Sequence, residues 1–386
     1  MTSKRKVCVL VTARPSYARI KSALQAIKDH PDLELVLVVA ASALLERYGH
    51  AIRSIEHDGF KPDARVYMVL EGENLVTSAK STGLGLVELA TVFDNHKPDV
   101  VVTVADRYET LATAVAASYM NIPVAHVQGG EVTGSIDEKV RHAVTKLADL
   151  HFVSTPLARE RVIKLGENSD QVYMTGCPSI DLAAEVVRAP ALDFDPFEKY
   201  GGVGEKVDLS GGFLVVMQHP VTTEHDNARH QVDETLHAVH GLKLPTLWFW
   251  PNVDAGSDGT SKGIRIFREA HRDSQLHLFR NMLPEDFLRL LVNSSCIIGN
   301  SSVAIRECSY LRVPAVNIGT RQQGRERGKN VIDVSYDRTE IRAAIEQHLR
   351  QERPPTDTLY GDGKAGERIA HLLATEPLPI EKRLTY

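Results

Sequence analysis

The amino-acid sequence predicts an α/β protein with two Rossmann-like, doubly wound domains that face each other across a cleft. Short apolar runs alternate with helix-length amphipathic segments, a pattern typical of parallel sheets covered by helices on both faces. The alternation lapses once, between Ala189 and Gly212, where Pro, Gly and Asp dominate as in a linker. Because 386 residues exceed the size of one hydrophobic core, we expect two domains with the ligand bound between them.

The order of the apolar runs gives the predicted elements. The strands predicted for the first domain are 6–12, 33–39, 66–69, 99–105, 123–128, 151–155 and 172–176. Those predicted for the second domain are 213–218, 244–250, 276–280, 296–300 and 314–319. Helical stretches separate these strands. We place the domains at 1–188 and 205–365, and we expect a C-terminal helix and tail at 366–386 to pack back on the first domain.

Composition and charge exclude several classes of protein. Hydrophobic residues make up 43% of the chain and charged residues 25%, which is ordinary for a globular protein. A net charge of -5 gives no reason to expect a nucleic acid or a membrane as partner, and apolar runs such as 35–45 are too short to span a bilayer. The four cysteines Cys8, Cys177, Cys296 and Cys308 form no CxxC pair, so neither a disulfide framework nor a zinc site is indicated. We expect a cytoplasmic protein.

The chain lacks the motifs of several common enzyme classes. GLGLVE at Gly83 breaks the GxGxxG spacing of dinucleotide-binding proteins and lies in a helical segment. The sequence also has no GxxxxGK[ST], GxSxG or HExxH motif. Oxidoreductase, P-loop kinase, serine hydrolase and zinc peptidase functions are therefore disfavoured.

The stretch from His126 to His142 has the composition of a catalytic loop. An apolar strand ends at the glycine pair Gly129-Gly130, and a helix is predicted to start near Asp137. Asp137 and Arg141 are four residues apart, as are Glu138 and His142, so each pair shares a helix face. The plain alternative is a capped helix with a surface ion pair. The accumulation of three acids, two histidines and an arginine in one stretch favours a functional loop.

Two further loops of the first domain suit an anion and a sugar. In open α/β sheets the ligand-binding loops follow the carboxyl ends of the strands. Arg14 follows the first strand and Pro15 opens a helix, so a guanidinium meets a helix N-terminus, and both favour phosphate. Asp106 and Arg107 emerge side by side after the strand at 99–105.

The second domain offers groups for a diphosphate and a ribose. In GNSSVAIRE, Ser301 and Ser302 are predicted to begin a helix whose free N–H groups suit a diphosphate. Glu307, one to two turns along that helix, could accept hydrogen bonds from two vicinal ribose hydroxyls. Arg321 and Arg325 form a second predicted phosphate clamp. The alternatives are a serine N-cap, a solvated glutamate and a solvated arginine face.

These segments together resemble the hydrolysing UDP-N-acetylglucosamine 2-epimerases, a family that includes the bacterial sialic-acid enzyme and the epimerase half of the vertebrate bifunctional enzyme. The resemblance runs collinearly from about residue 6 to 335 and rests on ARPSY, DRYE, HVQGGEVTGSIDEKVRHAVTK, GCPSID, QHPVTTE, PNVDAGS, GNSSVAIRE and GTRQQGRERG. It implies a GT-B fold, a homo-oligomer (dimer or tetramer) and a role in sialic, legionaminic or related sugar biosynthesis. The implied reaction eliminates the nucleoside diphosphate to a 2-acetamidoglucal, then adds water to release N-acetylmannosamine.

The resemblance also implies roles for individual residues. Asp106, Glu131 and Asp137 are the candidate acids and bases, and His219 is a candidate for contact with the diphosphate or the leaving oxygen. No metal or cofactor is required, because arginines, a histidine and a helix N-terminus can take the phosphate charge. The residues expected to bind the nucleotide sugar are Arg14, Arg107, His126, Gln128, Arg141, Asn252, Ser301, Ser302, Glu307 and Arg321.

Departures from the family pattern leave the substrate open. Vertebrate and non-hydrolysing relatives have Glu where this chain has Gln128, and a neutral amide cannot be a base, so we expect that role at Glu131 or Asp137. The alternative is that Gln128 only orients the sugar. Ala43 and Ala18 stand where relatives have His and Ser. A GDP-linked or modified UDP sugar is therefore an alternative substrate. Alternative functions are a non-hydrolysing epimerase, a GT-B glycosyltransferase and a sugar-nucleotide sensor.

Overall fold

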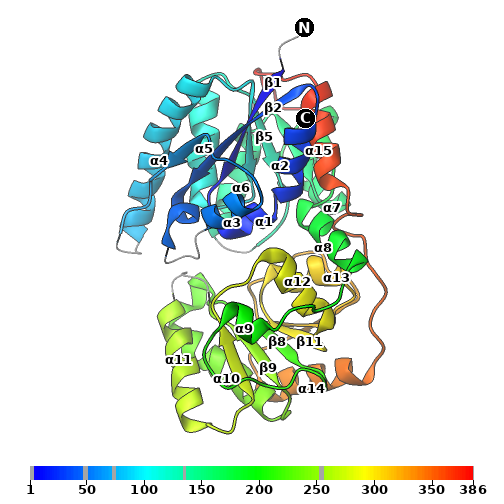
Figure 1. The fold of residues 1–386 in the computed structure, drawn as a ribbon. Helices are drawn as coiled ribbons and strands as arrows, with labels where there is room; N and C mark the ends of the chain where they lie inside the picture. Colours follow the sequence, from blue (N-terminus) through cyan, green and yellow to red (C-terminus); the bar gives the residue numbers. More distant parts are fainter. Residues whose placement is uncertain (1–3, 47–50, 72–74, 134–135, 252–255, 386) are drawn as a thin grey trace. The chain divides into compact units, whose positions relative to one another are not determined.

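The computed structural model describes residues 4–46, 51–71, 75–133, 136–251 and 256–385. The chain forms two compact units (Figure 1). The first unit runs from the N-terminus to Glu131, from Ile136 to Leu182 and from Leu359 to the C-terminus. The second unit comprises Ala183–Thr358 and the short segment that begins at Val132. The units thus divide within helix α8 (Pro178–Arg188) and at Leu359, whereas the sequence placed the borders at residues 188 and 365.

The first unit is built on a parallel sheet with the strand order β3-β2-β1-β4-β5-β6-β7. The order reverses between β1 and β4, which makes this pair the topological switch point of a doubly wound sheet. The strands are β1 (Arg5–Val11), β2 (Leu33–Ala40), β3 (Ala64–Val66), β4 (Val100–Val104), β5 (Val124–Val127), β6 (Leu150–Val153) and β7 (Val172–Met174).

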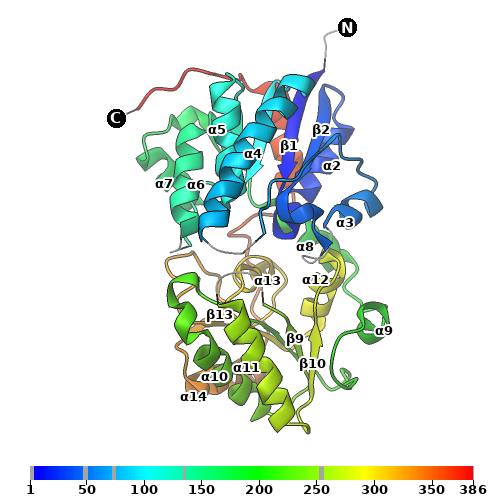
Figure 2. The same ribbon diagram turned by 90° about the vertical axis from the view of Figure 1, so that its left-hand side faces the viewer.

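Helices cover both faces of this sheet, because its strands are apolar on both sides. Val7, Val9 and Val11 belong to one core, while Cys8 and Leu10 belong to the other. Figures 1 and 2 show α4 and α5 on one side of the sheet and α2 and α15 on the other. The helices are α1 (Arg14–Ala18), α2 (Lys21–Asp29), α3 (Ala51–His57), α4 (Leu75–His96), α5 (Tyr108–Tyr119), α6 (Ile136–Leu147), α7 (Pro156–Lys164) and α15 (Ala365–Thr375). Short 3₁₀ turns lie at η1 (Ala41–Leu44) and η3 (Ser169–Gln171).

The C-terminal helix α15 packs within the first unit. Asp181 on α8 accepts hydrogen bonds from the backbone N–H groups of Ala365 and Gly366 at 2.9 and 2.7 Å. A Cβ at Gly366 would lie 2.6 Å from the carbonyl carbon of Ser22, so only glycine lets α15 approach α2 this closely.

The second unit repeats the doubly wound arrangement, with the parallel order β10-β9-β8-β11-β12-β13 and its switch point between β8 and β11. Its strands are β8 (Leu214–Met217), β9 (Thr246–Phe249), β10 (Leu276–Phe279), β11 (Cys296–Gly299), β12 (Ala315–Ile318) and β13 (Val331–Val334). Its helices are α9 (Pro196–Tyr200), α10 (Ala228–His240), α11 (Ser257–Ala270), α12 (Pro284–Asn293), α13 (Glu307–Tyr310) and α14 (Arg338–Arg350), with 3₁₀ turns at η4 (Thr222–Asn227) and η5 (Ser302–Ala304).

The structure differs from the prediction in three places. The strand predicted at 66–69 is β3, which lies two residues earlier and ends at Val66. Strand β13 was not predicted, because its residues are largely half-buried and it carries an aspartate. The predicted linker contains α9, whose N-terminus is capped by Asp195, and a segment that pairs with the edge strand β10.

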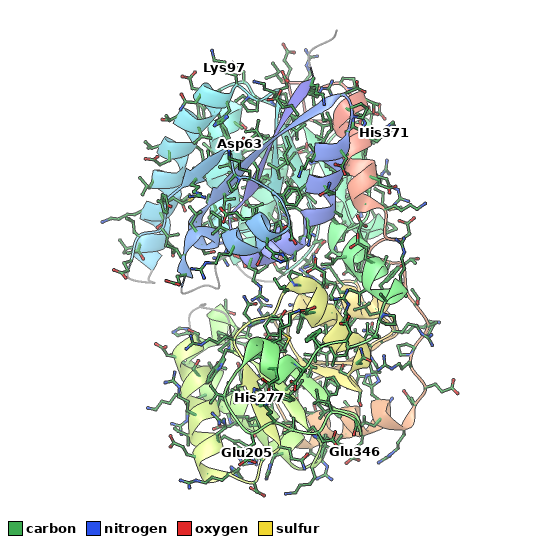
Figure 3. The ribbon with its side chains drawn as sticks, in the orientation of Figure 1. Asp63, Lys97, Glu205, His277, Glu346 and His371 are labelled. Carbon is green, nitrogen blue, oxygen red and sulfur yellow. The ribbon has the colours of Figure 1, made fainter. Side chains whose placement is uncertain are left out.

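That paired segment protects the sheet edge. The backbones of Val203 and Leu278 exchange two hydrogen bonds of 2.9 Å. The two ring nitrogens of His277 face the carbonyl oxygens of Glu205 and Gly201 at 3.0 and 2.9 Å. Figure 3 labels His277 and Glu205 in the second unit. The apparent linker therefore continues the second unit and covers an edge that would otherwise expose unpaired backbone groups.

A buried charge cluster fixes the C-terminal tail to the first unit. The carboxylate of Glu167 is 2% exposed and pairs with Lys146 at 2.6 Å, His151 at 3.1 Å and Lys382 at 2.5 Å. These three hydrogen bonds outweigh burial and lower the pKa of Glu167 to about 2.

No helix of the described residues is long and apolar enough to cross a membrane.

Replacing Glu167 with Gln is expected to flatten the acid dependence of stability. The folded pKa of Glu167 lies below its ordinary value of 4.5, so the charged form stabilises the fold above pH 4.5 and this contribution is lost as the pH falls towards 2. The shift corresponds to about 3 kcal/mol. Urea unfolding of the wild type and the variant at a series of pH values measures the difference in their free energies of unfolding. Burial raises the pKa of Asp149 to about 6, which gives an opposing pH dependence, but this contribution is common to both proteins and cancels in the difference. If the difference in free energy of unfolding between the wild type and the variant were the same at pH 7 and at pH 3, the prediction would be contradicted.

Candidate functional site

Backbone strain gathers at the carboxyl ends of the strands around the first switch point. Ala41 follows β2, Ala105 follows β4 and Gln128 follows β5, and all three adopt left-handed conformations with φ of 53°, 68° and 69°. Such conformations are unfavourable for residues with a Cβ and persist where the surrounding structure holds them, often at functional sites. Arg14, at the start of α1, follows β1 at the same edge of the sheet.

Asp106 and Arg141 form a buried ion pair at this edge. The Arg141 side chain is 2% exposed and that of Asp106 is 11% exposed. Arg141 also donates a hydrogen bond of 2.7 Å from Nη1 to the carbonyl oxygen of Glu131. The guanidinium on α6 thereby connects the loop after β4 to the loop after β5, and it holds the Asp106 carboxylate in one place. The alternative of a surface ion pair for Arg141 is wrong, because the side chain is buried.

The predicted carboxylates lie on elements that this pair joins. Glu131 is 4% exposed, and its backbone is held by Arg141. Asp137 is half-buried in the first turn of α6, one turn before Arg141. The predicted neighbours Glu138 and His142 do pair, with 3.4 Å between Oε1 and Nε2. Arg141 therefore links the loops at Asp106 and Glu131 to helix α6, which carries Asp137.

His126 does not fit the prediction that it binds the substrate. Its side chain is completely buried, and its two ring nitrogens face the Thr145 hydroxyl at 3.2 Å and the Ala105 carbonyl oxygen at 2.8 Å. Burial, opposed by the Ala105 hydrogen bond, lowers the pKa of His126 to about 4, so the ring is neutral at physiological pH. Both ring nitrogens are thus used within the protein.

Gln128 is held in the turn by the GCPSID motif, to whose residues the sequence assigned no role in the site. Its Nε2 lies 2.9 Å from Sγ of Cys177, which in turn lies 3.0 Å from the Ser179 hydroxyl. A Cβ at Gly130, where φ is 75°, would lie 2.2 Å from the carbonyl oxygen of Ala158 in α7. The GCPSID motif therefore supports the turn after β5, and the glycine allows its close approach to α7.

A further acidic residue was missed in the DRYE motif. Glu109 is fully buried in the first turn of α5, with one oxygen 3.4 Å from Nε of Arg107. Its Oε1 has no hydrogen-bond partner among the residues that the structure describes. The Arg107 side chain, 42% exposed, remains accessible to a ligand. The spacing of Arg107 and Glu109 was visible in the sequence, but the burial of Glu109 was not.

In the second unit, Asn300 ties together the loops at the switch point. Its Nδ2 donates to the His219 carbonyl oxygen and its Oδ1 accepts from the His219 N–H, both at 2.8 Å. Arg321 and Gln322 donate to the Asn300 carbonyl oxygen at 3.2 and 2.9 Å. Burial, followed by the charge of Arg321, lowers the pKa of His219 well below its usual value. His219 is therefore a neutral imidazole beside an arginine.

The segment after β11 differs from the predicted helix. Ser301 precedes the single 3₁₀ turn η5, and Glu307 begins a separate short helix, α13. The prediction of one continuous helix is wrong, so its dipole cannot act on a diphosphate as expected. Arg306 donates to the Ser302 hydroxyl at 3.0 Å.

Glu307 remains suited to bind a ligand. Its side chain is 9% exposed, and its Oε2 is a buried oxygen with no hydrogen-bond partner among the described residues. A hydrogen bond from a ligand hydroxyl to such an oxygen should stabilise the bound state, because it removes the cost of a buried acceptor without a donor. The predicted residue Asn252 lies outside the described residues.

Comparisons with known proteins agree with the predicted fold and family. The family model described as UDP-N-acetylglucosamine 2-epimerase matches residues 25–374. The UDP-N,N'-diacetylbacillosamine 2-epimerase (hydrolyzing) of Legionella pneumophila is 32% identical over 375 residues, 97% of this chain and 97% of that protein. The GDP/UDP-N,N'-diacetylbacillosamine 2-epimerase (hydrolyzing) of Campylobacter jejuni is 30% identical and covers 86% of this chain and 84% of its own.

A solved structure supports the fold. The UDP-GlcNAc 2-epimerase from Neisseria meningitidis bound to UDP-GlcNAc superposes with a TM-score of 0.80 over 95% of this chain and 99% of that chain, at 17% identity. The predicted α/β architecture with two Rossmann-like domains is confirmed, as is the family resemblance. The chain belongs to the UDP-N-acetylglucosamine 2-epimerase family.

Proposed function

We propose that this protein is a hydrolysing nucleotide-sugar 2-epimerase. It converts UDP-N-acetylglucosamine, or a related UDP- or GDP-linked 2-acetamido sugar, and water into a nucleoside diphosphate and the free 2-epimer, N-acetylmannosamine in the first case. The observation that carries the proposal is the Asp106–Arg141 pair, which fixes a carboxylate at the switch point of the first sheet. The names of the Legionella and Campylobacter relatives, both hydrolysing 2-epimerases, support it.

Elimination requires a base for the weakly acidic C2 proton and groups that neutralise the departing diphosphate. We assign proton transfer to Asp106, Glu131 and Asp137. Water then adds to the glucal: one carboxylic acid protonates C2 from the opposite face, while a carboxylate takes the proton of the water that attacks C1. Gln128 cannot serve as a base, since its amide is neutral and bonded to Cys177.

The second unit supplies the proposed nucleotide-binding groups. Neutral His219 can donate one hydrogen bond to the diphosphate, and Arg321 adds positive charge beside it. Glu307 has an oxygen without a hydrogen-bond partner among the described residues, and a ribose hydroxyl can donate to it. Arg14, Arg107, Ser301 and Ser302 complete the proposed binding set, together with Asn252.

The choice of sugar has a second candidate. Both relatives carry N,N'-diacetylbacillosamine in their names, so a 2,4-diacetamido sugar linked to UDP or GDP is an alternative substrate. The departure at Gln128 is consistent with a changed sugar, because this residue differs from the glutamate of vertebrate and non-hydrolysing relatives. The proposed pathway is accordingly the biosynthesis of a sialic, legionaminic or related acid.

The test is incubation in D₂O with UDP-N-acetylglucosamine, GDP-N-acetylglucosamine and UDP-N,N'-diacetylbacillosamine, followed by NMR. We expect nucleoside diphosphate and a free 2-epimer carrying deuterium at C2, without any acceptor. A UDP-linked epimer would identify a non-hydrolysing enzyme, and diphosphate release only with an acceptor would identify a glycosyltransferase. Product without deuterium would refute the elimination mechanism, and binding without turnover would indicate a sensor.

Replacing Asn300 with Ala is expected to weaken UDP binding by about tenfold, because two buried His219 backbone groups lose their partners. Isothermal titration with UDP measures the effect. Asn317→Ala, at a buried asparagine of the neighbouring strand β12 whose Nδ2 bonds Asp333, is the matched control. Equal UDP affinity in the two variants would show that the Asn300 clamp does not position the nucleotide site.

A further inference from the structure

The residue before Asp106 is held in a strained conformation. Strand β4 ends at Val104, and Ala105 turns the chain with a φ of 68°. A left-handed alanine costs roughly 1 kcal/mol or more and reverts unless its backbone is fixed. The Ala105 N–H donates to the Val127 carbonyl oxygen at 3.0 Å, which fixes the N-terminal side of this residue.

His126 fixes the other side. Its Nε2 lies 2.8 Å from the Ala105 carbonyl oxygen, and a carbonyl can only accept, so the proton of the neutral ring is on Nε2. Its Nδ1 then accepts a hydrogen bond from the Thr145 hydroxyl, 3.2 Å away. The low pKa of His126 agrees with a single ring proton. The imidazole therefore has a defined tautomer and one donor, which is committed to the strained turn.

Asp106 is thus constrained at both ends. Arg141 holds its carboxylate, while the turn at Ala105 sets the direction in which its side chain leaves the backbone. If the backbone at Ala105 were free to change conformation, the Asp106 carboxylate could shift from its position, either together with the Arg141 guanidinium or away from it. Misplacement of a reacting group by about 1 Å can lower a rate a hundredfold, so the conformation of the turn at Ala105 should directly affect turnover.

We propose that His126 is a positioning residue that locks the left-handed turn at Ala105 and thereby aims Asp106 for proton transfer. The proposal rests on the proposed function, in which Asp106 transfers protons. It differs from the role of an ordinary buried histidine, because it requires the single hydrogen bond from Nε2 to the Ala105 carbonyl oxygen. A space-filling role would require only the ring's volume.

Three variants of His126 separate these roles. In Gln the amide nitrogen reaches the position of Nε2, whereas in Asn it reaches only that of Nδ1, and Leu fills space without a donor. We expect His126→Gln to keep near wild-type turnover, and His126→Asn and His126→Leu to lose about tenfold to a hundredfold in kcat with KM little changed. Thr145→Val is the matched control, since it removes the partner of the other ring nitrogen and leaves the Ala105 bond in place. It should lower stability without lowering kcat.

A second substitution tests the strain itself. Glycine adopts a positive φ without penalty, so Ala105→Gly should restore most of the lost kcat in the His126→Asn background, while having little effect in the wild type. Loss of kcat in His126→Gln equal to that in His126→Leu, or no rescue by Ala105→Gly, would overturn the proposal.

Crystal structures of the variants give a readout that does not depend on activity. We expect Ala105 to leave the left-handed region in His126→Asn and to remain there in His126→Gln. An Ala105 φ unchanged in His126→Asn and His126→Leu would overturn the inference even if the wild-type protein released no nucleoside diphosphate. A wild-type protein that releases no nucleoside diphosphate would refute the proposed function but not the inference about Ala105. The two failures are therefore distinguishable.

Discussion

Asp106→Asn is expected to lower turnover at least about a hundredfold, the usual scale for a lost acid or base. Asparagine keeps the shape of aspartate and an oxygen for Arg141, but it cannot take up or release the proton that elimination and hydration transfer. Glu131→Gln and Asp137→Asn are expected to cause losses of the same order. Because each substitution is nearly isosteric and leaves the nucleotide-binding groups proposed above in place, including Arg107 beside Asp106, UDP affinity should change little in each variant.

The measurement is initial-rate release of nucleoside diphosphate, with UDP titration on the same samples. Asp181→Asn is the matched control: Asp181 is another buried aspartate of the first unit, but it holds the start of α15 rather than the turn after β4. Full activity in Asp106→Asn would remove Asp106 from the mechanism. Full activity in Glu131→Gln would remove Glu131 from the mechanism. Asp137 would then be the remaining candidate for the base that relatives have at the position of Gln128.

Local sequence patterns predicted the parts of the site that depend on strand ends. Buried parallel strands are apolar along their whole length, so their ends could be placed within a few residues, and polar groups directly after them marked the switch-point edge of each sheet. Asp106, Gln128 and His219 were found in this way. The structure places each of them at the carboxyl end of its predicted strand.

Pairings between distant segments could not be predicted in the same way. Helical spacing suggested Asp137 as a neighbour of Arg141, but it gave no sign that the buried guanidinium pairs with Asp106, which lies in the loop after β4. The polar ring of His126 suggested a ligand contact, yet the carbonyl oxygen of Ala105 and the hydroxyl of Thr145 occupy both ring nitrogens. Such contacts depend on the register of β4 against β5 and on the placement of α6, which no single-sequence periodicity encodes.

The Asp106–Arg141 pair should therefore affect stability as well as activity. Arg141→Met is expected to destabilise the first unit by about 3–5 kcal/mol, because removal of one partner leaves a buried carboxylate without its counter-charge. Methionine keeps most of the side-chain volume, so a cavity contributes little. Turnover should also fall, since Arg141 then holds neither the Asp106 carboxylate nor the Glu131 backbone.

The two tryptophans of the chain, Trp248 and Trp250, lie in the second unit and provide an internal reference. If the units unfold independently, Arg141→Met should move the urea transition seen by circular dichroism and leave that of tryptophan fluorescence in place. Arg368→Met is the matched control, because its ion pair with Asp362 in the same unit is about half exposed and should contribute less than about 1 kcal/mol.

A double-mutant cycle decides whether the stability loss comes from the ion pair. If an uncompensated carboxylate is the cause, Asp106→Asn combined with Arg141→Met should be more stable than Arg141→Met alone, since the neutral amide is less costly to bury. Additive losses would instead assign the effect to the hydrogen bond between Arg141 and the Glu131 carbonyl oxygen. In that case the arginine would organise the loop after β5 first, and the position of Asp106 would depend mainly on the turn at Ala105.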